Sequence, residues 1–370
     1  MNSPKIIVYS PYAPSAPGAA GMRVKAIQDA LERENARVTI LTPRDGREWS
    51  IFQRIQDEKP STIIATSPPL PPLAWVWFAA KVSGSRFILD AKDDGRALAL
   101  LSKKNNSWKE IMYLQLRAFL YKNADRIWFL TQSDKEEARQ RYHLSESRTA
   151  IVPNGCDERI TFSTVLRKKI RSEWNVSPRR MVLLYAGSLG DEDIHGFVQA
   201  TQKIRDNYHL IFVATVDNTT QDRARRDALH AQLNQKEQSY HFYENISPSE
   251  LSAIFSGADI GIVPWSDDLP SSIPVKTFDY AGTGLPILAK CPPSGELHAL
   301  LENNKEWGDS IASWDAFPRA FARTLRRFSL SKYTLKQRAV HAKRVQETWG
   351  RRKRIQREMS RVIDMNKNQS

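Results

Sequence analysis

Residues 271–290 read SSIPVKTFDYAGTGLPILAK and combine a turn, a short helix and a strand. Ser271 and Ser272 stand just before a proline, a pattern typical of a turn that leads into a helix beginning near Val275. The glycines of AGTGLP suit a left-handed cap that ends this helix. The apolar run LPILAK then predicts a buried strand. The stretch therefore predicts one helix-to-strand step of an α/β sheet.

Two charged side chains lie on one face of this helix. Lys276 and Asp279 are three residues apart, so they share a face. The exposed N–H groups at a helix start suit a phosphate, and Lys276 adds a positive charge there. A carboxylate at Asp279 can accept hydrogen bonds from both hydroxyls of a ribose. Together the helix start, the cation and the carboxylate indicate a nucleotide site.

Short apolar strands alternate with helical stretches on both sides of this segment. The predicted strands are 5–10, 36–42, 61–67, 86–91, 125–131 and 149–153, and then 181–188, 209–215, 239–245, 258–264 and 285–290. Strands that alternate with helices predict doubly wound parallel sheets. The rhythm restarts after a linker near 155–178. The expected fold class is therefore α/β, with two Rossmann-like domains at 1–160 and 175–340 and a basic C-terminal helix at 341–370 that packs back on the first domain. Ligands bind at the carboxyl ends of such strands, where the two sheets can face each other across a cleft.

Loops at three other strand ends carry candidate site residues. In YSPYAPSAPGAAGMR, Gly18 and Gly21 let the backbone approach a ligand, and Arg23 can contact a phosphate. In LLYAGSLGDED, Gly187 and Ser188 place small groups near a diphosphate at a helix N-terminus. Glycine loops and helix caps without any ligand are common, so the structural alternative stays open for both loops.

The stretch ILDAKDDG is the third such loop. It places Asp90, Asp93 and Asp94 at a strand end. Carboxylates there can bind sugar hydroxyls, accept a proton or hold a metal. They can equally cap the next helix, and both interpretations remain open.

The charge of the chain is +14 and unevenly distributed. Residues 319–361 hold 15 lysines and arginines against two acids, so this one segment carries +13. A solvated helix face is the plain interpretation; basic residues next to aromatic ones also suit an anionic bilayer surface. Cys156 and Cys291 lie far apart without other ligands at metal spacing, so we expect two ordinary thiols in a reducing cytoplasm. No secretory signal or membrane-spanning run is visible.

The motifs resemble glycosyltransferase family 4, a group of GT-B enzymes. The family pattern reads S-hydrophobic-P-x-K-hydrophobic-F/Y-E-Y-x-A-x-G-x-P, and the matching positions are Ser272, Pro274, Lys276, Phe278, Tyr280, Gly284 and Pro286, with Asp279 in place of Glu. Four further segments resemble parts of the family: 9–23 its N-terminal loop, 124–157 its hinge-side segment, 247–264 its aD…P segment, and 348–362 its closing helix. The resemblance covers nearly the whole chain.

This resemblance implies a retaining, metal-independent glycosyltransferase that moves a sugar from a nucleotide diphosphate sugar to an acceptor hydroxyl. It implies no metal and no cofactor besides this co-substrate. In the second domain it assigns the diphosphate to Gly187, Ser188, Ser272 and Lys276, the ribose to Asp279, and the base to the backbone of Ile246. In the first domain it assigns the phosphate or sugar to Gly21 and Arg23. It assigns the acceptor to Asp93 and Asp94. Ser271 stands where the family has an acid that contacts the donor sugar, and the second glycine loop lacks the family's basic residue.

The implied acceptor is a glycan or glycolipid of cell-envelope synthesis. We therefore expect a cytoplasmic protein, peripheral at the inner face of the membrane, with an anionic membrane surface as a partner. Three alternatives stay open: a DNA-modifying glycosyltransferase or nucleic-acid binder, which the charge favours; a sugar-nucleotide epimerase of the same fold; and a relative without activity, because of Ser271.

Overall fold

The structure is a computed structural model. It describes residues 3–16, 18–43, 48–92, 107–190, 192–204, 208–216, 219–235, 238–329 and 333–367. The chain forms two compact units, which are described separately: residues 1–154 together with 351–370, and residues 155–350.

The first unit is built on a parallel sheet of six strands in the order β2-β1-β3-β4-β5-β6. Their bounds are β1 Lys5–Tyr9, β2 Arg37–Leu41, β3 Thr62–Ser67, β4 Arg86–Ala91, β5 Arg126–Phe129 and β6 Thr149–Ile151. The chain moves from β1 outward to β2 and then returns past β1 to β3. The strand order therefore reverses between β1 and β3, which is the switch point where such sheets bind ligands.

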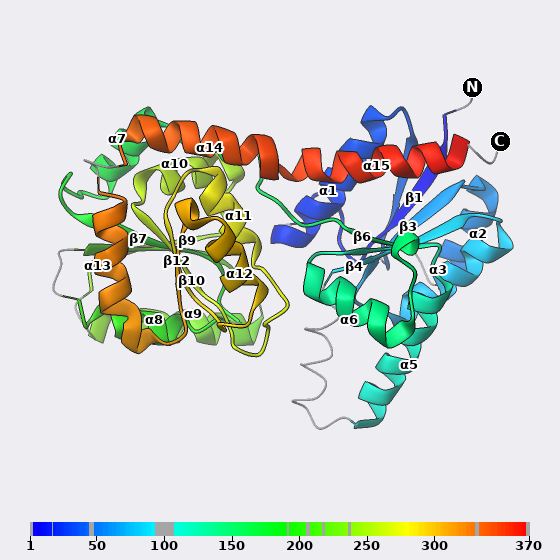
Figure 1. Ribbon diagram of the computed structural model, residues 1–370, viewed down its shortest axis with the longest axis horizontal. Coiled ribbons are helices and arrows are strands. Elements are labelled where there is room, and N and C mark those ends of the chain that lie inside the picture. The colour runs from blue at the N-terminus through cyan, green and yellow to red at the C-terminus, as the bar shows by residue number, and fades with distance from the viewer. Residues whose placement is uncertain are drawn as a thin grey trace. The chain divides into compact units, whose positions relative to one another are not determined.

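Helices cover both faces of this sheet (Figure 1). One face packs against α2 Glu48–Glu58, α3 Pro71–Val82, α5 Ser107–Asn123 and α6 Gln132–Tyr142. The other face packs against α1 Gly18–Arg33 and α15 Arg351–Lys367, which lie along each other. α15 contributes Ile355, Met359 and Val362 to the core. The last helix is therefore a structural part of the first unit.

The second unit holds another parallel sheet of six strands, in the order β12-β11-β10-β7-β8-β9. Their bounds are β7 Met181–Ser188, β8 Tyr208–Thr215, β9 Tyr240–Glu244, β10 Ile260–Pro264, β11 Ile287–Lys290 and β12 Gly308–Ile311. Here the chain runs from β7 outward to β9 and then returns to the other side of β7 as β10. The switch point lies between β7 and β10.

The second sheet is also covered on both faces. α7 Thr164–Glu173, α10 Pro248–Gly257, α11 Val275–Gly282, α12 Glu296–Asn303 and α14 Leu335–Trp349 cover one face. α8 Ile194–Thr201, α9 Thr220–Gln235 and α13 Phe317–Arg327 cover the other. The doubly wound α/β fold class predicted from the alternating strands and helices is confirmed.

The element boundaries differ from the prediction at three places. The expected linker contains α7, which packs on α10 and so belongs to the second unit. β12 was not predicted, because its sequence GDSI is short and partly polar. Residues 341–350 belong to α14 and the second unit, so the division between the last two helices falls at Gly350, not at residue 341.

Candidate functional site

The predicted phosphate-binding residues meet at the switch point of the second unit. Gly187 and Ser188 end β7, and Lys276 lies in the first turn of α11. A Cβ atom added to Gly187 would lie 2.8 Å from Cε of Lys276 and 3.2 Å from the hydroxyl of Tyr185. A side chain at this position would therefore displace the end of the lysine side chain, which passes directly over the backbone.

The ammonium group of Lys276 is buried and paired. Its Nζ lies 2.5 Å from both carboxylate oxygens of Glu192 and 4.2 Å from the centre of the Tyr185 ring. The side chains of Lys276 and Glu192 are only 8% and 5% exposed. Burial lowers the pKa of Lys276 from its ordinary value, and the Glu192 carboxylate opposes that shift. The site thus holds a cation that already has an anionic partner.

Asp279, one turn further along α11, is held by a backbone N–H group. One carboxylate oxygen accepts a hydrogen bond of 2.8 Å from the backbone N–H of Asp157, and the side chain is buried. Asp157 in turn holds Arg159 through its own carboxylate. The orientation of Asp279 is therefore set by the segment that follows β6.

Tyr280 explains how α11 is anchored. Its hydroxyl accepts a hydrogen bond of 2.8 Å from the backbone N–H of Ala186 on β7. Its ring packs on Gly261 of β10 so closely that an added Cβ would be 2.5 Å away. Burial raises the pKa of Tyr280 well above its ordinary value, so it stays a neutral hydroxyl. This side chain ties α11 to both strands of the switch point.

The start of α11 leaves polar groups for an anion. The helix begins at Val275, as predicted, and no side chain caps it. The hydroxyl of Thr277, in the first turn, is buried and lacks a hydrogen-bond partner within the described residues. Ser271 and Ser272 lie in the turn before the helix and are half-buried. At the other end, Gly284 has a φ of +62°, which supplies the predicted left-handed cap.

Ile246 lies just beyond the carboxyl end of β9 in the second sheet. Asn245 holds this turn through a pair of 3.0 Å hydrogen bonds with the backbone of Val216. Ile246 itself is half-buried against the core. The structure thus places the predicted base contact at the carboxyl end of a strand two positions from β7.

Arg23 differs from the prediction. It is 1% exposed, and its guanidinium is held by the Asp90 carboxylate and by the carbonyl of Val152 at 3.0 Å. A charge buried this deeply requires a partner, and Asp90, which follows 67 residues later, supplies it. Arg23 therefore links α1 to the ends of β4 and β6 and does not extend toward a ligand.

Close packing within α1 and its loop explains why position 21 is a glycine. It lies inside α1, and an added Cβ would come within 2.9 Å of the Ala16 carbonyl carbon. The absence of a side chain lets the loop fold back on its own helix. Asp93 and Asp94 lie outside the described residues. Within the described part of the chain, no three carboxylate, imidazole or thiol groups form a metal-binding cluster.

The basic segment at the C-terminus is divided between the two units. Of the aromatic residues in or near it, Trp307, Phe317 and Phe321 are buried, and Trp314, Phe328 and Trp349 are half-buried. Arg338 is buried too and donates to the carbonyls of Phe255 and Ala258. The three buried aromatic side chains therefore belong to the core of the second unit. No helix in the described residues is long and apolar enough to cross a membrane.

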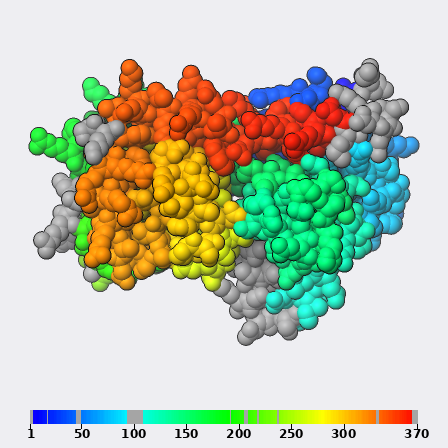
Figure 2. Space-filling view, viewed as in Figure 1, coloured from blue at the N-terminus to red at the C-terminus, as the bar shows by residue number. Residues whose placement is uncertain are grey.

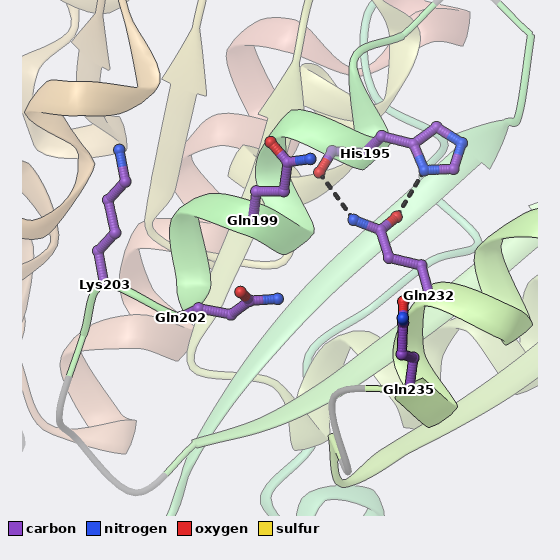
Figure 3. A pocket seen from close by; sticks show the side chains of 6 residues that line it. All are labelled: His195, Gln199, Gln202, Lys203, Gln232 and Gln235. Carbon is purple, nitrogen blue, oxygen red and sulfur yellow. Dashed lines mark hydrogen bonds between the residues drawn. The ribbon is translucent and has the colours of Figure 1, made fainter.

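An open pocket of about 630 Å³ lies between α8 and α9 (Figure 3). Its lining is polar and consists of His195, Gln199, Gln202, Lys203, Gln232 and Gln235. Gln232 spans it by hydrogen bonds to the ring and carbonyl of His195. None of the predicted site residues lines this pocket, so it is separate from the arrangement around Lys276.

Known proteins resemble this chain in part of its sequence and in its whole fold. A model of the family "Glycosyl transferase 4-like domain" matches residues 47–155. Over these residues the chain is similar to this family. This confirms the predicted resemblance over residues 47–155, whereas the motif at 271–290 lies outside the matched residues.

The solved structures that resemble the chain are GT-B glycosyltransferases. Sucrose-phosphate synthase from Thermosynechococcus elongatus superimposes with a TM-score of 0.77 at 16% identity, covering 99% of this chain and 100% of that one. HepE of Anabaena, solved with UDP-glucose, gives 0.72 at 13% identity over 98% and 99%. WaaG, a glycosyltransferase of lipopolysaccharide biosynthesis, gives 0.63 at 14% over 96% and 99%. At such identities the likeness establishes the GT-B fold, as predicted.

Proposed function

We propose that this protein is a retaining glycosyltransferase that transfers a sugar from a nucleoside diphosphate sugar to an acceptor hydroxyl. The observation that carries the proposal is the meeting of Gly187, Lys276 and Asp279 at the switch point of the second sheet. A bare backbone, a buried cation and an oriented carboxylate are the three groups that a nucleotide diphosphate needs.

The diphosphate binds at the start of α11. The positive end of the helix dipole, the Thr277 hydroxyl and the Lys276 ammonium all carry positive or donor character there. Negative charge grows on the diphosphate as the sugar leaves, so these groups stabilise the departing group more than the bound donor. The Glu192 carboxylate holds the Lys276 ammonium in place, and the diphosphate becomes a second anionic partner of the same cation.

The nucleoside extends from this point along the strand ends. Asp279 accepts hydrogen bonds from the ribose hydroxyls while the Asp157 N–H keeps its carboxylate in place. The backbone of Ile246 contacts the base. Ser188 faces the diphosphate, and Ser271 and Ser272 approach the donor from the turn before α11.

The transfer itself needs few protein groups. The acceptor oxygen forms the new bond to the anomeric carbon on the face from which the diphosphate departs, and a phosphate oxygen takes up the acceptor proton. The helix start and Lys276 supply the charge stabilisation for which other enzymes use a metal ion. We assign Asp93 and Asp94 to the acceptor. The acceptor is a glycan or glycolipid of cell-envelope synthesis, as for the structural neighbour WaaG.

The test is product formation from defined donors. Because the structural neighbour HepE was solved with UDP-glucose, that donor is the first of a panel that also includes ADP-, GDP- and TDP-sugars. Release of the nucleoside diphosphate should depend on an added acceptor and persist in chelator. Proton NMR of the product should show the anomeric configuration of the donor. An inverted product, or activity abolished by chelator and restored by a divalent cation, would contradict the proposal.

A further inference from the structure

Among the described residues of the first unit, large apolar side chains are exposed on three helices. Eight of the twelve large apolar side chains that are exposed in the described residues come from three helices, α2, α3 and α5. We call this surface the α2–α3–α5 face; it consists of Trp49, Phe52, Trp75, Phe78, Val82, Trp108, Ile111, Met112 and Phe119. Proteins rarely expose this many large apolar side chains on neighbouring helices without a function.

The rings on this face contact one another across the helices. Phe52 of α2 stacks on Trp49 of the same helix and on Phe78 of α3, with ring-centre distances of 5.2 and 5.9 Å. Phe119 of α5 meets Trp77 of α3 edge to face at 4.7 Å. Figure 2 shows this part of the chain, coloured light blue to turquoise, at the surface of the first unit. These contacts join α2 to α3, and α3 to α5 at Phe119.

Each helix needs only one of its sides for the core. Ile51 and Ile55 of α2, and Leu73 and Val76 of α3, already cover the sheet. Trp75, Phe78 and Val82 recur at intervals of three and four residues on the outer side of α3. Packing of the first unit thus does not account for the exposed rings.

The charge of the chain indicates what covers this face. The first unit holds 30 lysines and arginines against 18 acids, a net charge of +12, whereas the second unit holds 25 against 23, a net charge of +2. A second copy of this unit would bring two strongly positive bodies together, whereas an anionic bilayer attracts one. Lys109 lies over the Trp108 ring at 5.4 Å, and Lys81 and Lys122 are exposed near the same helices.

We propose that the α2–α3–α5 face docks the protein on an anionic phospholipid bilayer. Tryptophan rings are stable at the boundary between lipid headgroups and acyl chains because they present an apolar body and a polar N–H. Lysine stems extend along the apolar surface while their ammonium groups reach the lipid phosphates. The proposal deepens the proposed glycolipid acceptor by naming the membrane-binding surface, but lipid binding itself does not depend on sugar transfer.

This surface replaces the basic C-terminal segment as the docking site. α15 packs on the opposite face of the sheet from α2, α3 and α5. Its Arg351 is buried and donates to the backbone of Asn154. Charges on α15 therefore contribute long-range attraction, and the aromatic face makes the contact.

Vesicle flotation of the full chain tests the proposal. The patch variant carries Trp75→Ser, Phe78→Ser and Trp108→Ser, three exposed positions. The matched control carries Val165→Ser and Val340→Ser, which remove exposed apolar groups from the second unit. A third variant carries Lys353→Glu and Arg357→Glu on the exposed side of α15. Vesicles contain phosphatidylcholine with or without phosphatidylglycerol, at low and physiological salt.

We expect the wild type and the control to float with anionic vesicles. The partition coefficient of the patch variant should be at least about tenfold lower, because the rings it lacks would bury a large apolar area. The α15 variant should lose less than the patch variant. A wild-type measurement that needs no variant is quenching of tryptophan fluorescence by lipids brominated in their acyl chains, which should occur only with anionic vesicles.

Three results would overturn the docking proposal. These are equal flotation of the patch variant and the control, absence of quenching in the wild type, and a wild-type dimer in light scattering that the patch variant converts to monomer without any vesicle binding. Transfer to a soluble acceptor is measured in parallel. If transfer occurs without vesicle binding, the docking surface fails and the proposed activity stands; if vesicles bind without transfer to any acceptor, the reverse holds.

Discussion

The buried pair of Lys276 and Glu192 gives a quantitative test of the candidate site. Nζ and both carboxylate oxygens are 2.5 Å apart, and both side chains are almost fully buried. Lys276→Met leaves the Glu192 carboxylate buried without its cation, and Glu192→Gln leaves the ammonium without its anion. Removing one partner of a buried pair costs about 3 to 5 kcal/mol, whereas replacing both is often close to neutral.

We therefore predict that each single variant lowers the free energy of unfolding by about 3 kcal/mol or more. The double variant should recover most of that loss, so the interaction energy from the cycle should exceed about 2 kcal/mol. Urea unfolding followed by circular dichroism measures these values from the midpoints at a common slope. Exposed pairs such as Lys25 with Asp29 serve as the comparison and should give less than about 1 kcal/mol. Single variants that each cost under about 1 kcal/mol and add without coupling would refute the burial of this pair.

Three further predictions concern the same unit. Gly187→Ala should displace the Lys276 side chain and weaken nucleoside diphosphate binding in calorimetry, because its Cβ would lie 2.8 Å from Cε; unchanged affinity would contradict the close approach. Asp279→Ala should weaken donor binding by about 1 to 3 kcal/mol, and Asp279→Asn should keep the Asp157 contact but still bind more weakly than the wild type. Burial and His241 lower the pKa of His209 to about 4. As the pH falls from 6.5 to 4 the unfolded state therefore binds a proton that the folded state does not, and the protein loses stability. His209→Gln should flatten this decline in the urea midpoint.

Local sequence patterns predicted the backbone of the site. The serines and proline before Val275 fixed the start of α11, and Gly284 marked its end, because both features depend on residues within one turn. The apolar runs predicted eleven of the twelve strands that the described residues form, since buried parallel strands are almost wholly apolar. β12 escaped because its four residues carry no such signal.

Side-chain partners were the part that the sequence could not supply. Glu192 meets Lys276 across 84 residues, and Asp90 meets Arg23 across 67, so neither pair has a local pattern. An arginine near a glycine loop has the same sequence signature whether it binds a phosphate or a buried aspartate. The exposed rings of α2, α3 and α5 were likewise invisible, because apolar residues at helical spacing ordinarily indicate core.

The binding of a nucleoside diphosphate sugar at Lys276 is the central claim, and one comparison tests it most directly. Titration calorimetry of the donor panel is carried out on the wild type and on Lys276→Met/Glu192→Gln, the double variant in which both charges are removed and the fold is expected to survive. We predict that a donor bound by the wild type loses at least about tenfold in affinity in the double variant, since a charged contact to the diphosphate is gone. Equal affinity in the two folded proteins would contradict the claim.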